Sequence, residues 1–214
     1  MTDKPMIFSA PMVRALMLGN KTQTRRRLKE QNSIADAVKI GGRYQWKSWK
    51  TGCILGDVAL PYAPGNRLWV REAHTLTTDC KSVVYRVDAT DMHGWRWETI
   101  TPGDPRGEVK WRPSIHMPRW ASRLTLVVTD VRVQRISEIT LGECWAEGCE
   151  TARDLIDAHV IPKGAQLPFK EFRDLWNSLH GPDAWARNDW VVCLSFETHR
   201  KNIDEMGAQH VSAD

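Results

Sequence analysis

Alternation of hydrophobic and polar residues predicts a small β-sheet. Residues 67–72 (Arg-Leu-Trp-Val-Arg-Glu) follow a Pro-Gly-Asn turn and alternate in this way, and residues 83–87 and 190–196 have the same strand character. The clearest strand extends over residues 123–136, where the hydrophobic positions change parity at residues 129–130. We expect a bulge or turn at that point, which would help the sheet to curl into a small barrel.

Hydrophobic residues at helical spacing predict three helices. The first spans residues 11–18, with proline in its first turn and Gly19 after its last turn. The second spans residues 140–148 and starts with the capping-box sequence Thr-x-x-Glu. The third spans residues 168–180 and ends at a Gly-Pro pair. This order of elements predicts an α+β fold, a curled and mostly antiparallel sheet with flanking helices.

The length of the chain, 214 residues, suits one domain with its own core, and no Pro/Gly/Ser-rich linker divides it. We therefore expect a single domain over residues 1–198. Two polar stretches are predicted insertions: residues 30–65, either an insertion or a pair of weak strands, and residues 89–114, a long functional loop. Residues 199–214 are predicted to form a polar, frayed C-terminal tail.

Several functional classes are disfavoured by composition. The chain has no long uncharged apolar run, so no membrane span is predicted, and its first residues lack the apolar segment of a secretory signal, which indicates a cytoplasmic protein. The five cysteines show neither the even clustering of a disulfide framework nor the Cys-x-x-Cys pairs of a zinc site. We expect no structural metal, no cofactor and reduced thiols at Cys53, Cys80, Cys144, Cys149 and Cys193.

The net charge of +4 is mild, but the basic residues are grouped. One run is Arg25-Arg26-Arg27, and a second group comprises Lys110, Arg112, Arg119 and Arg123. Eleven tryptophans are more than a core of this size needs. Those in polar and basic surroundings could stack on unpaired bases, or they could pack under long loops; they are Trp46, Trp49, Trp95, Trp97, Trp111 and Trp120.

The segment from Gly19 to Arg26 (Gly-Asn-Lys-Thr-Gln-Thr-Arg-Arg) is the strongest candidate for chemistry. Lys21 and Thr24 are three residues apart, within reach of each other if the segment forms a turn. A lysine amine whose pKa is lowered by burial or by neighbouring cations can activate a threonine hydroxyl as a nucleophile. The alternative is a basic turn in which the threonine bonds to its own backbone.

The same segment resembles the signature Gly-x-Lys-x-x-Glu-x-Arg of the ASCH family, a branch of the PUA-like fold, with Thr24 in place of the glutamate. This variant is similar to the small bacterial acetylcytidine amidohydrolases, in which the lysine and the second threonine are functional. The wider chain, from residue 4 to about 198, resembles phage-encoded ASCH-like proteins in its Leu-Trp-Val-Arg-Glu and Pro-Ser-Ile-His-Met-Pro-Arg-Trp segments. The resemblance implies a PUA-like barrel, a phage or prophage origin, and catalytic roles for Lys21 and Thr24.

The resemblance also implies a glutamate in the capped helix after the long strand. That position falls on Cys149, with Glu147 and Glu150 on either side, and Glu72 at the end of its strand is a third candidate. A buried carboxylate near the lysine would suit proton transfer. Two of these residues also have a purely structural interpretation, an ion pair for Glu72 and a solvated helix position for Glu147.

Substrate or nucleic-acid contacts are expected from the basic and aromatic residues of these segments. His116 could act as an acid or base or stack on a base, although a lone histidine is more often a hydrogen-bonded loop residue. The predicted binding residues are Arg25, Arg26, Trp69, Arg71, Arg112, His116, Arg119 and Trp120.

Three functions stay open from the sequence. The first is binding of RNA or another nucleic acid, DNA included, with hydrolysis of an amide on a modified nucleoside such as acetylcytidine. The second is an RNA-binding module without chemistry, and the third is a ribonuclease that uses a loosely bound divalent cation. The two insertions favour a polymer over a free nucleoside as the ligand.

Overall fold

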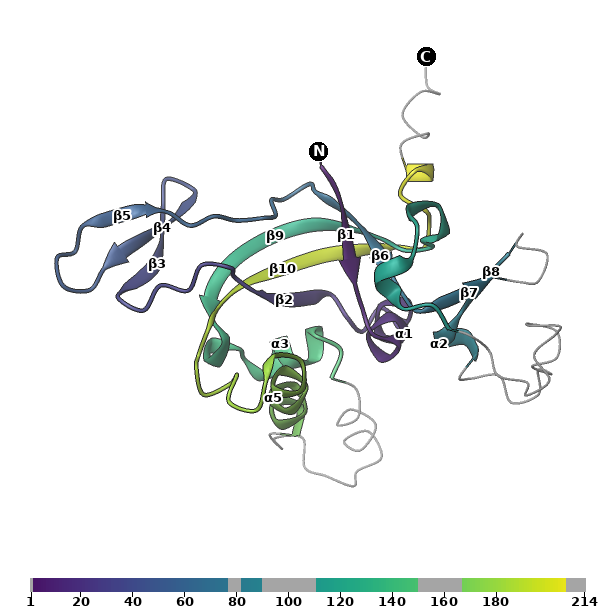
Figure 1. Ribbon diagram of the computed structural model, residues 1–214. Coiled ribbons are helices and arrows are strands. Elements are labelled where there is room, and N and C mark those ends of the chain that lie inside the picture. The colour runs from purple at the N-terminus through teal and green to yellow at the C-terminus, as the bar shows by residue number, and fades with distance from the viewer. Residues whose placement is uncertain (1, 77–81, 90–110, 150–166, 207–214) are drawn as a thin grey trace, which may run out of the picture. The chain divides into compact units, whose positions relative to one another are not determined.

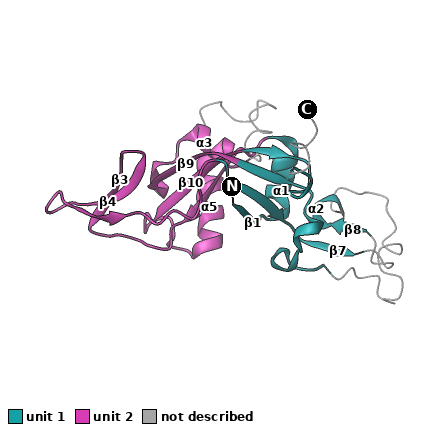
Figure 2. Ribbon diagram, turned by 90° about the horizontal axis from the view of Figure 1, so that it is seen from above, with its two compact units in different colours: residues 1–19, 65–127, 197–214 teal, residues 20–64, 128–196 magenta. Residues whose placement is uncertain are grey.

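The computed structural model describes residues 2–76, 82–89, 111–149 and 167–206, and its elements form a mixed α+β fold (Figure 1). The chain forms two compact units: unit 1 comprises residues 1–19, 65–127 and 197–214, and unit 2 comprises residues 20–64 and 128–196 (Figure 2). The predicted α+β class is confirmed. Among the described strands no closed barrel is found, so the curled barrel and the single domain over residues 1–198 stay predictions.

Unit 1 contains the first two elements of the chain and those of its middle part. Its strands and helices are β1 (Asp3–Ile7), α1 (Ala10–Leu18), β6 (Arg67–Arg71), β7 (His74–Leu76), β8 (Val83–Tyr85) and α2 (Arg86–Ala89), followed by the short 3-10 helices η2 (Ser114–His116) and η3 (Arg119–Ala121). Unit 2 contains β2 (Gln23–Arg27), β3 (Ala35–Ile40), β4 (Arg43–Ser48), β5 (Ile54–Asp57), η4 (Ile136–Glu138), α3 (Leu141–Ala146) and α5 (Leu167–His180). The long strands β9 (Thr125–Arg135) and β10 (Trp190–His199) have residues in both units.

Three sheets organise these strands. The largest has the order β1-β6-β9-β10-β2, in which β1 is parallel to β6 while the β6–β9 and β10–β2 pairs are antiparallel. A second sheet, β3-β4-β5, is antiparallel throughout, and β7 pairs with β8.

The helix predicted over residues 11–18 is confirmed as α1. Gly19 ends it in the left-handed conformation, with φ 78°, and donates its backbone N–H to the carbonyls of Ala15 and Leu16. Glycine adopts this conformation without a Cβ penalty, which explains why the helix stops there. The strand predicted over residues 83–87 is shorter, because Arg86 begins α2.

Residues 30–65 form a three-stranded sheet rather than a pair of weak strands. The β3–β4 hairpin turns at Gly41-Gly42, where φ is 56° and 84°. Positive φ at both central residues of a two-residue turn suits the twist of a hairpin, and glycine adopts it readily. Alternation in this segment is weak because the inward-facing positions include Ala35, Ser48 and only one large apolar side chain, that of Trp46.

Strand β9 runs without a turn through residues 129–130, so the predicted turn is wrong there. The buried positions do change parity, from Leu126 and Val128 to Val131 and Val133. Strand β10 is buried at every position from Trp190 to Leu194. Both of its faces are covered: Trp190 packs edge to face on Trp46 with 5.6 Å between ring centroids, while Val191 belongs to the cluster under α5.

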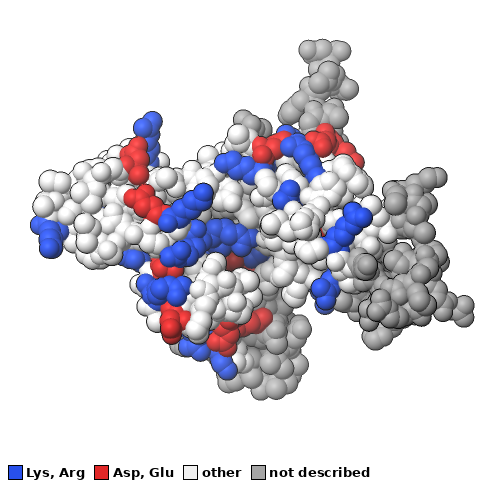
Figure 3. Space-filling view, in the orientation of Figure 1, with Lys and Arg blue, Asp and Glu red and all other residues white. Residues whose placement is uncertain are grey.

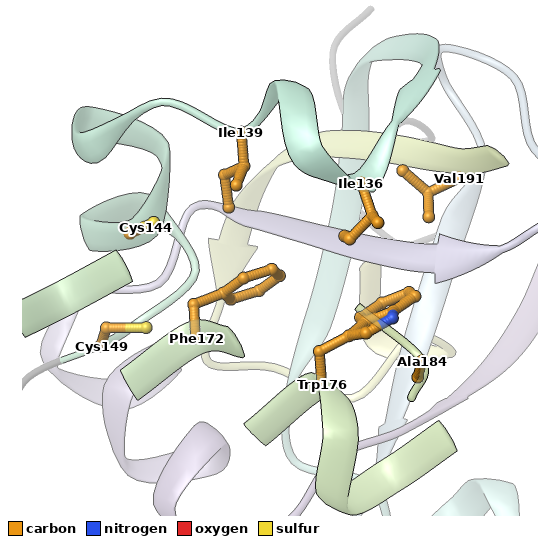
Figure 4. Close-up of a cluster of buried hydrophobic side chains, with 8 residues drawn as sticks. All are labelled: Ile136, Ile139, Cys144, Cys149, Phe172, Trp176, Ala184 and Val191. Atoms are coloured by element: carbon orange, nitrogen blue, oxygen red, sulfur yellow. The ribbon is translucent and has the colours of Figure 1, made fainter. Parts of the chain in front are cut away.

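That cluster is a hydrophobic core within unit 2. Figure 4 shows Phe172 and Trp176 of α5 directed toward Ile136, Ile139 and Val191. Of the predicted i, i+3, i+4 stripe on the third helix, Phe172 and Trp176 are buried in this core and Phe169 packs against it, whereas Leu179 is exposed. The complete cluster consists of Ile136, Ile139, Cys144, Cys149, Phe172, Trp176, Ala184 and Val191, with Phe169 and Trp185 packed against it.

The expected fraying after Thr198 is wrong for the residues that the structure describes. Ile203 is fully buried, and the Asn202 side-chain amide donates hydrogen bonds to the backbone carbonyls of Arg119, Trp120 and Ser122. The Thr125 hydroxyl donates to the carbonyl of Lys201 at 2.9 Å. Residues 199–206 are thus part of unit 1, and the residues from 207 onward lie outside the described part.

Replacing Phe172 by alanine should lower the free energy of unfolding by about 3–5 kcal/mol, because the ring leaves a cavity in this core. Leu179→Ala on the same helix is the control, since Leu179 is 63% exposed, and it should change the value by less than about 0.5 kcal/mol. Urea titration followed by circular dichroism measures both. Equal losses for the two variants would show that α5 does not bury the face that carries Phe172.

Candidate functional site

The segment between α1 and β2 lies beside the end of α3 in unit 2. Lys21 forms an antiparallel bridge with Glu147, and the Thr22 backbone N–H donates to the Ala146 carbonyl at 2.9 Å. Helix α3 is set in place by the predicted capping box: the Glu143 backbone N–H donates to the Thr140 hydroxyl, and the Thr140 backbone N–H donates to the Glu143 carboxylate. The capped start of α3 thus fixes where Glu147, at its end, meets Lys21.

A buried cluster of charged side chains occupies this junction. Lys21 Nζ donates to Glu147 Oε2 at 2.9 Å and to the Glu147 backbone carbonyl at 2.6 Å. Arg25 NH1 donates to Glu147 Oε1 at 2.9 Å, and Arg25 NH2 lies 3.0 Å from Glu143 Oε2. The side chains of Lys21, Arg25 and Glu147 are almost fully buried, so this is a dry ion-pair network.

Glu143 extends the network toward β9. Its Oε1 accepts a hydrogen bond from Arg132 NH2 at 2.8 Å, while its Oε2 belongs to the capping box. Burial raises the pKa of Glu143, but the Thr140 N–H and the charges of Arg25 and Arg132 outweigh it, so the pKa lies below its usual value. Sequence reasoning assigned Glu143 only a capping role, and it missed the second role because Arg25 and Arg132 are distant in sequence.

The network joins cations and carboxylates in equal number. The cations are Lys21, Arg25 and Arg132, and the carboxylates are Glu143, Glu147 and Asp130, the last of which lies 3.4 Å from Arg132 Nε. Burial lowers the pKa of Lys21, while the neighbouring Glu147 carboxylate partly restores it. Among the described residues, the buried Nε of Arg25 has no hydrogen-bond acceptor. A lysine with a lowered pKa and an arginine N–H without an acceptor are suited to proton transfer and to binding an oxygen atom.

Arg26 is a further cation near Glu147, and Tyr62 is also among its neighbours. Burial lowers its pKa, and the charges of Glu147 and Tyr62 act in the opposite direction. Burial also raises the pKa of the Tyr62 phenol, which the positive charge of Arg26 partly offsets. Tyr62 was not among the predicted site residues, since nothing in the polar stretch of residues 30–65 marks it as a neighbour of the basic run.

The sequence predicts a turn around Thr24, but the chain forms a strand from Gln23 onward. Thr24 is buried and lies opposite Leu194 in the β10–β2 pair. Successive side chains of a strand point to opposite faces, so Thr24 faces away from Gln23 and Arg25. On the Gln23 side, the Cys193 thiol donates to the Gln23 side-chain oxygen at 3.6 Å.

Three cysteines border the ion-pair network, and all of them are buried free thiols: Cys144, Cys149 and Cys193. Burial raises the pKa of the Cys144 thiol to about 11 and also raises those of Cys149 and Cys193. Thiols with raised pKa values are poor nucleophiles at neutral pH. The family resemblance implies a glutamate at the position of Cys149. That position is apolar in this structure, whereas Glu147, two residues earlier, lies in the ion-pair network.

The other predicted acid, Glu72, belongs to unit 1. Its carboxylate accepts hydrogen bonds from Arg123 Nε at 2.9 Å and NH2 at 3.0 Å, and Arg123 also binds Asp88. The Arg123 guanidinium lies over the Tyr85 ring, 3.8 Å from its centroid. Burial raises the pKa of Glu72, and Arg123 opposes that shift. Glu72 thus has the ion pair that its structural interpretation predicts, and Glu150 lies outside the described residues.

The remaining predicted binding residues in unit 1 are spread over several elements. Trp69 is buried, and the Arg71 guanidinium lies 4.5 Å from its ring centroid. Arg112 pairs through its backbone with His74, and Arg119 bonds to Asp3 and Asp204. His116 and Trp120 are exposed, the latter by 60%.

His74 is a buried residue of unit 1 that sequence reasoning missed. Its Nδ1 lies 3.3 Å from the Glu72 carbonyl. Burial lowers the pKa of the ring, the hydrogen bond with the Glu72 backbone raises it, and the charges of Arg112 and His116 lower it further. The backbone pairing of His74 with Arg112 brings the histidine next to a segment distant in sequence, and no local sequence signal marks that pairing.

Of the tryptophans singled out from the sequence, Trp46 is core, whereas Trp49 and Trp120 are exposed. Trp111 is half-buried, and Trp95 and Trp97 lie outside the described residues.

Comparisons of the chain with protein-family models, with curated proteins and with solved structures gave no match. The resemblance to the ASCH family stays a prediction. Within the described ranges, no three or more His, Cys, Asp or Glu side chains gather where they could hold a metal ion. None of the described helices has the length and apolar character that crossing a membrane requires.

Glu147→Gln should destabilise the protein by about 3–5 kcal/mol, since it leaves buried cations without a carboxylate. Lys21→Met should cost clearly less, because Glu147 keeps its hydrogen bond with Arg25. Arg25 cannot escape the loss by deprotonation, whereas Lys21 can. Denaturant unfolding measures the loss of stability in each variant. A larger loss for Lys21→Met than for Glu147→Gln would contradict the inference that Arg25 shares the Glu147 carboxylate with Lys21.

Glu143→Gln should be destabilising at neutral pH and become harmless in acid. The folded-state pKa of Glu143 lies below the unfolded value of 4.5, so its carboxylate contributes stability above that value and loses it as the pH falls through the folded pKa. Glutamine preserves the capping box, which isolates the effect of charge. Unfolding free energies of wild type and variant from neutral pH to about pH 3 test this, and a constant difference would refute it.

Proposed function

We propose that the chain binds RNA or another nucleic acid and hydrolyses an amide on a modified nucleoside such as acetylcytidine. The observation that carries the proposal is the buried contact of Lys21 with Glu147, at 2.9 Å. It joins the lysine of the family-like Gly-x-Lys-Thr-x-Thr segment to a carboxylate at the end of the capped helix. On this proposal the fold is a PUA-like barrel of the ASCH type, and Glu147 takes the role that the resemblance assigns to a position near Cys149.

In the proposed reaction the Thr24 hydroxyl oxygen attacks the amide carbonyl carbon while its proton passes to the Lys21 amine. The carbon–nitrogen bond then breaks, the leaving amine takes a proton from the Lys21–Glu147 pair, and the acyl group remains on Thr24. Water hydrolyses that ester, releasing the carboxylic acid and restoring the hydroxyl.

Two properties of Lys21 support a role as a base. Its pKa is lowered by burial, which increases the neutral fraction that can accept a proton. Its amine is also fixed by two acceptors, the Glu147 carboxylate and carbonyl, so its position is well defined. Pre-organisation of this kind is what proton transfer in an active site requires.

The basic residues of β2 support the nucleic-acid part of the proposal. Figure 3 shows Lys and Arg side chains gathered over β2, and Arg27 exposes 40% of its side chain while it is paired with Asp189. Arginine side chains beside a catalytic lysine could hold the phosphates that flank a modified base.

A binding module without chemistry is the second candidate. The burial of Lys21 and Thr24, each only 2% exposed, favours it, because a substrate would need access to both groups. In that case the Lys21–Glu147 pair holds β2 against α3, and the function depends on the basic surface alone. Such binding should weaken steeply with salt, because contacts with phosphates release counterions.

Thr24→Ala should abolish release of acetate from acetylcytidine while leaving the fold intact, and Lys21→Met should do the same. Thr22→Ala is the matched control, since Thr22 is an exposed threonine of the same segment. Mass spectrometry of the nucleoside after incubation provides the measurement, with circular dichroism as the check on folding. Full activity of Thr24→Ala would rule out the proposed nucleophile.

The same incubation with short single-stranded RNA, with and without manganese, separates the other functions. Cleavage that requires manganese would favour the ribonuclease. Intact substrates in every tube, together with RNA retained on the protein, would favour the binding module.

A further inference from the structure

The end of α3 brings two cysteines together. The helix ends in a Schellman motif, in which the Gly148 backbone N–H donates to the Trp145 carbonyl at 2.9 Å and the Cys149 backbone N–H donates to the Cys144 carbonyl at 3.3 Å. Gly148 adopts the left-handed conformation that this motif needs, with φ 86°. The residues that close the motif at its two ends are therefore both cysteines.

The side chains at these two positions of a Schellman motif commonly contact each other, and here both enter the same core. Cys144 and Cys149 are 0% and 1% exposed and belong to the hydrophobic cluster under α5. Figure 4 shows both side chains at one edge of that cluster, beside Phe172. The Cys144 thiol is also among the groups that raise the pKa of the Cys149 thiol, as expected of two sulfur atoms that lie close together.

This arrangement suits the geometry of a disulfide. The Cα atoms of a disulfide lie about 4.4–6.8 Å apart. Residues that are joined by backbone hydrogen bonds fall in this range, as in an antiparallel ladder, where hydrogen-bonded pairs have Cα atoms about 5.5 Å apart. The chain turns back on itself at Gly148, so rotation of the two side chains can bring the sulfur atoms into bonding contact.

We propose that Cys144 and Cys149 form a disulfide when the protein meets a peroxide, and that the pair is a site of reversible oxidation. In the first step one thiolate attacks an oxygen of hydrogen peroxide, which leaves a sulfenic acid on that cysteine and releases hydroxide. The second thiol then attacks the sulfenic sulfur, the S–S bond forms, and the hydroxyl group leaves as water. The two thiols lose two protons and two electrons, and one peroxide becomes two molecules of water.

The proximity of the second thiol distinguishes this pair from other buried cysteines. Burial raises the pKa of both thiols, so the first step is slow at neutral pH. A sulfenic acid that does form has its reaction partner already in place. Hydrogen peroxide is hardly larger than water, which suits a reaction inside a core.

This inference goes beyond the proposed hydrolysis and does not depend on it. Glu147 stands between the two cysteines in sequence, so the disulfide would close a ring around the residue that pairs with Lys21 and Arg25. Oxidation is therefore a covalent change at the centre of the ion-pair network.

The test begins with the folded, reduced chain, which is treated with hydrogen peroxide, freed of it, unfolded and alkylated. Cleavage after lysine and arginine gives a single peptide, residues 136–153, that contains both cysteines. Mass spectrometry should show this peptide without alkyl groups and lighter by two hydrogen atoms. Treatment with dithiothreitol before alkylation should restore two alkylated thiols.

Cys193 is the internal control. It is as buried as the pair, and burial raises the pKa of its thiol too, but it contacts Gln23 and Arg132. It should still be alkylated after a dose of peroxide that has oxidised the pair. Equal loss of alkylation at Cys193, or a disulfide that forms only when the chain is unfolded in urea, would overturn the proposal.

The midpoint of urea unfolding gives a second readout. Peroxide should raise the midpoint of the wild type, and reduction should reverse the change, because the closed ring restricts the unfolded chain. Cys149→Ser is the matched control, since it keeps the other oxidisable side chains, and its midpoint should not rise. A lower midpoint for the disulfide form than for the reduced form would contradict the inference that the core accommodates the bond.

Discussion

The organisation of unit 2 depends on keeping the Glu147 carboxylate charged in a dry environment. Moving an unpaired carboxylate out of water costs several kcal/mol or more, so the fold must supply cations with good geometry. It supplies two, Lys21 and Arg25, each with a hydrogen bond of 2.9 Å to a different oxygen. The start of β2 and the end of α3 are therefore held together, although more than a hundred residues separate them.

This constraint explains why so short a helix as α3 has a fixed place. Leu141–Ala146 is too short to be stable as an isolated helix. Its first turn is secured by the capping box, its last turn by the bridge with Lys21, and its inner face by Cys144 in the hydrophobic cluster. The same burial lowers the pKa of Lys21, so the feature that stabilises the junction also makes the amine a candidate base.

Unit 1 meets a similar constraint with one arginine between two carboxylates. Arg123 bonds to Glu72 and Asp88 and also lies over the ring of Tyr85. Glu72 is therefore matched by a single cation, whereas Glu147 accepts hydrogen bonds from two. The β3–β4–β5 sheet differs from both, because its Asp36 and Asp57 carboxylates are exposed, opposite Lys47 and Gln45.

The elements with local signals could be predicted from the amino-acid sequence. Gly19 ends α1, the Thr140–Glu143 capping box begins α3, and the apolar stripe on α5 has helical spacing, because each depends on residues within a few positions of one another. The sequence also singled out Lys21, Arg25 and Glu147, although it left Glu147, Glu150 and Glu72 as equal alternatives for the acid.

Which carboxylate pairs with Lys21 depends on how the chain folds in three dimensions. Ion pairs form between groups that are close in space, and the distance from residue 21 to residue 147 along the chain carries no such information. The same holds for Trp46 and Trp49, which stand three residues apart in similar polar surroundings. One is buried against Trp190 and the other is exposed, because strand alternation and the packing of a distant strand decide which side each indole faces.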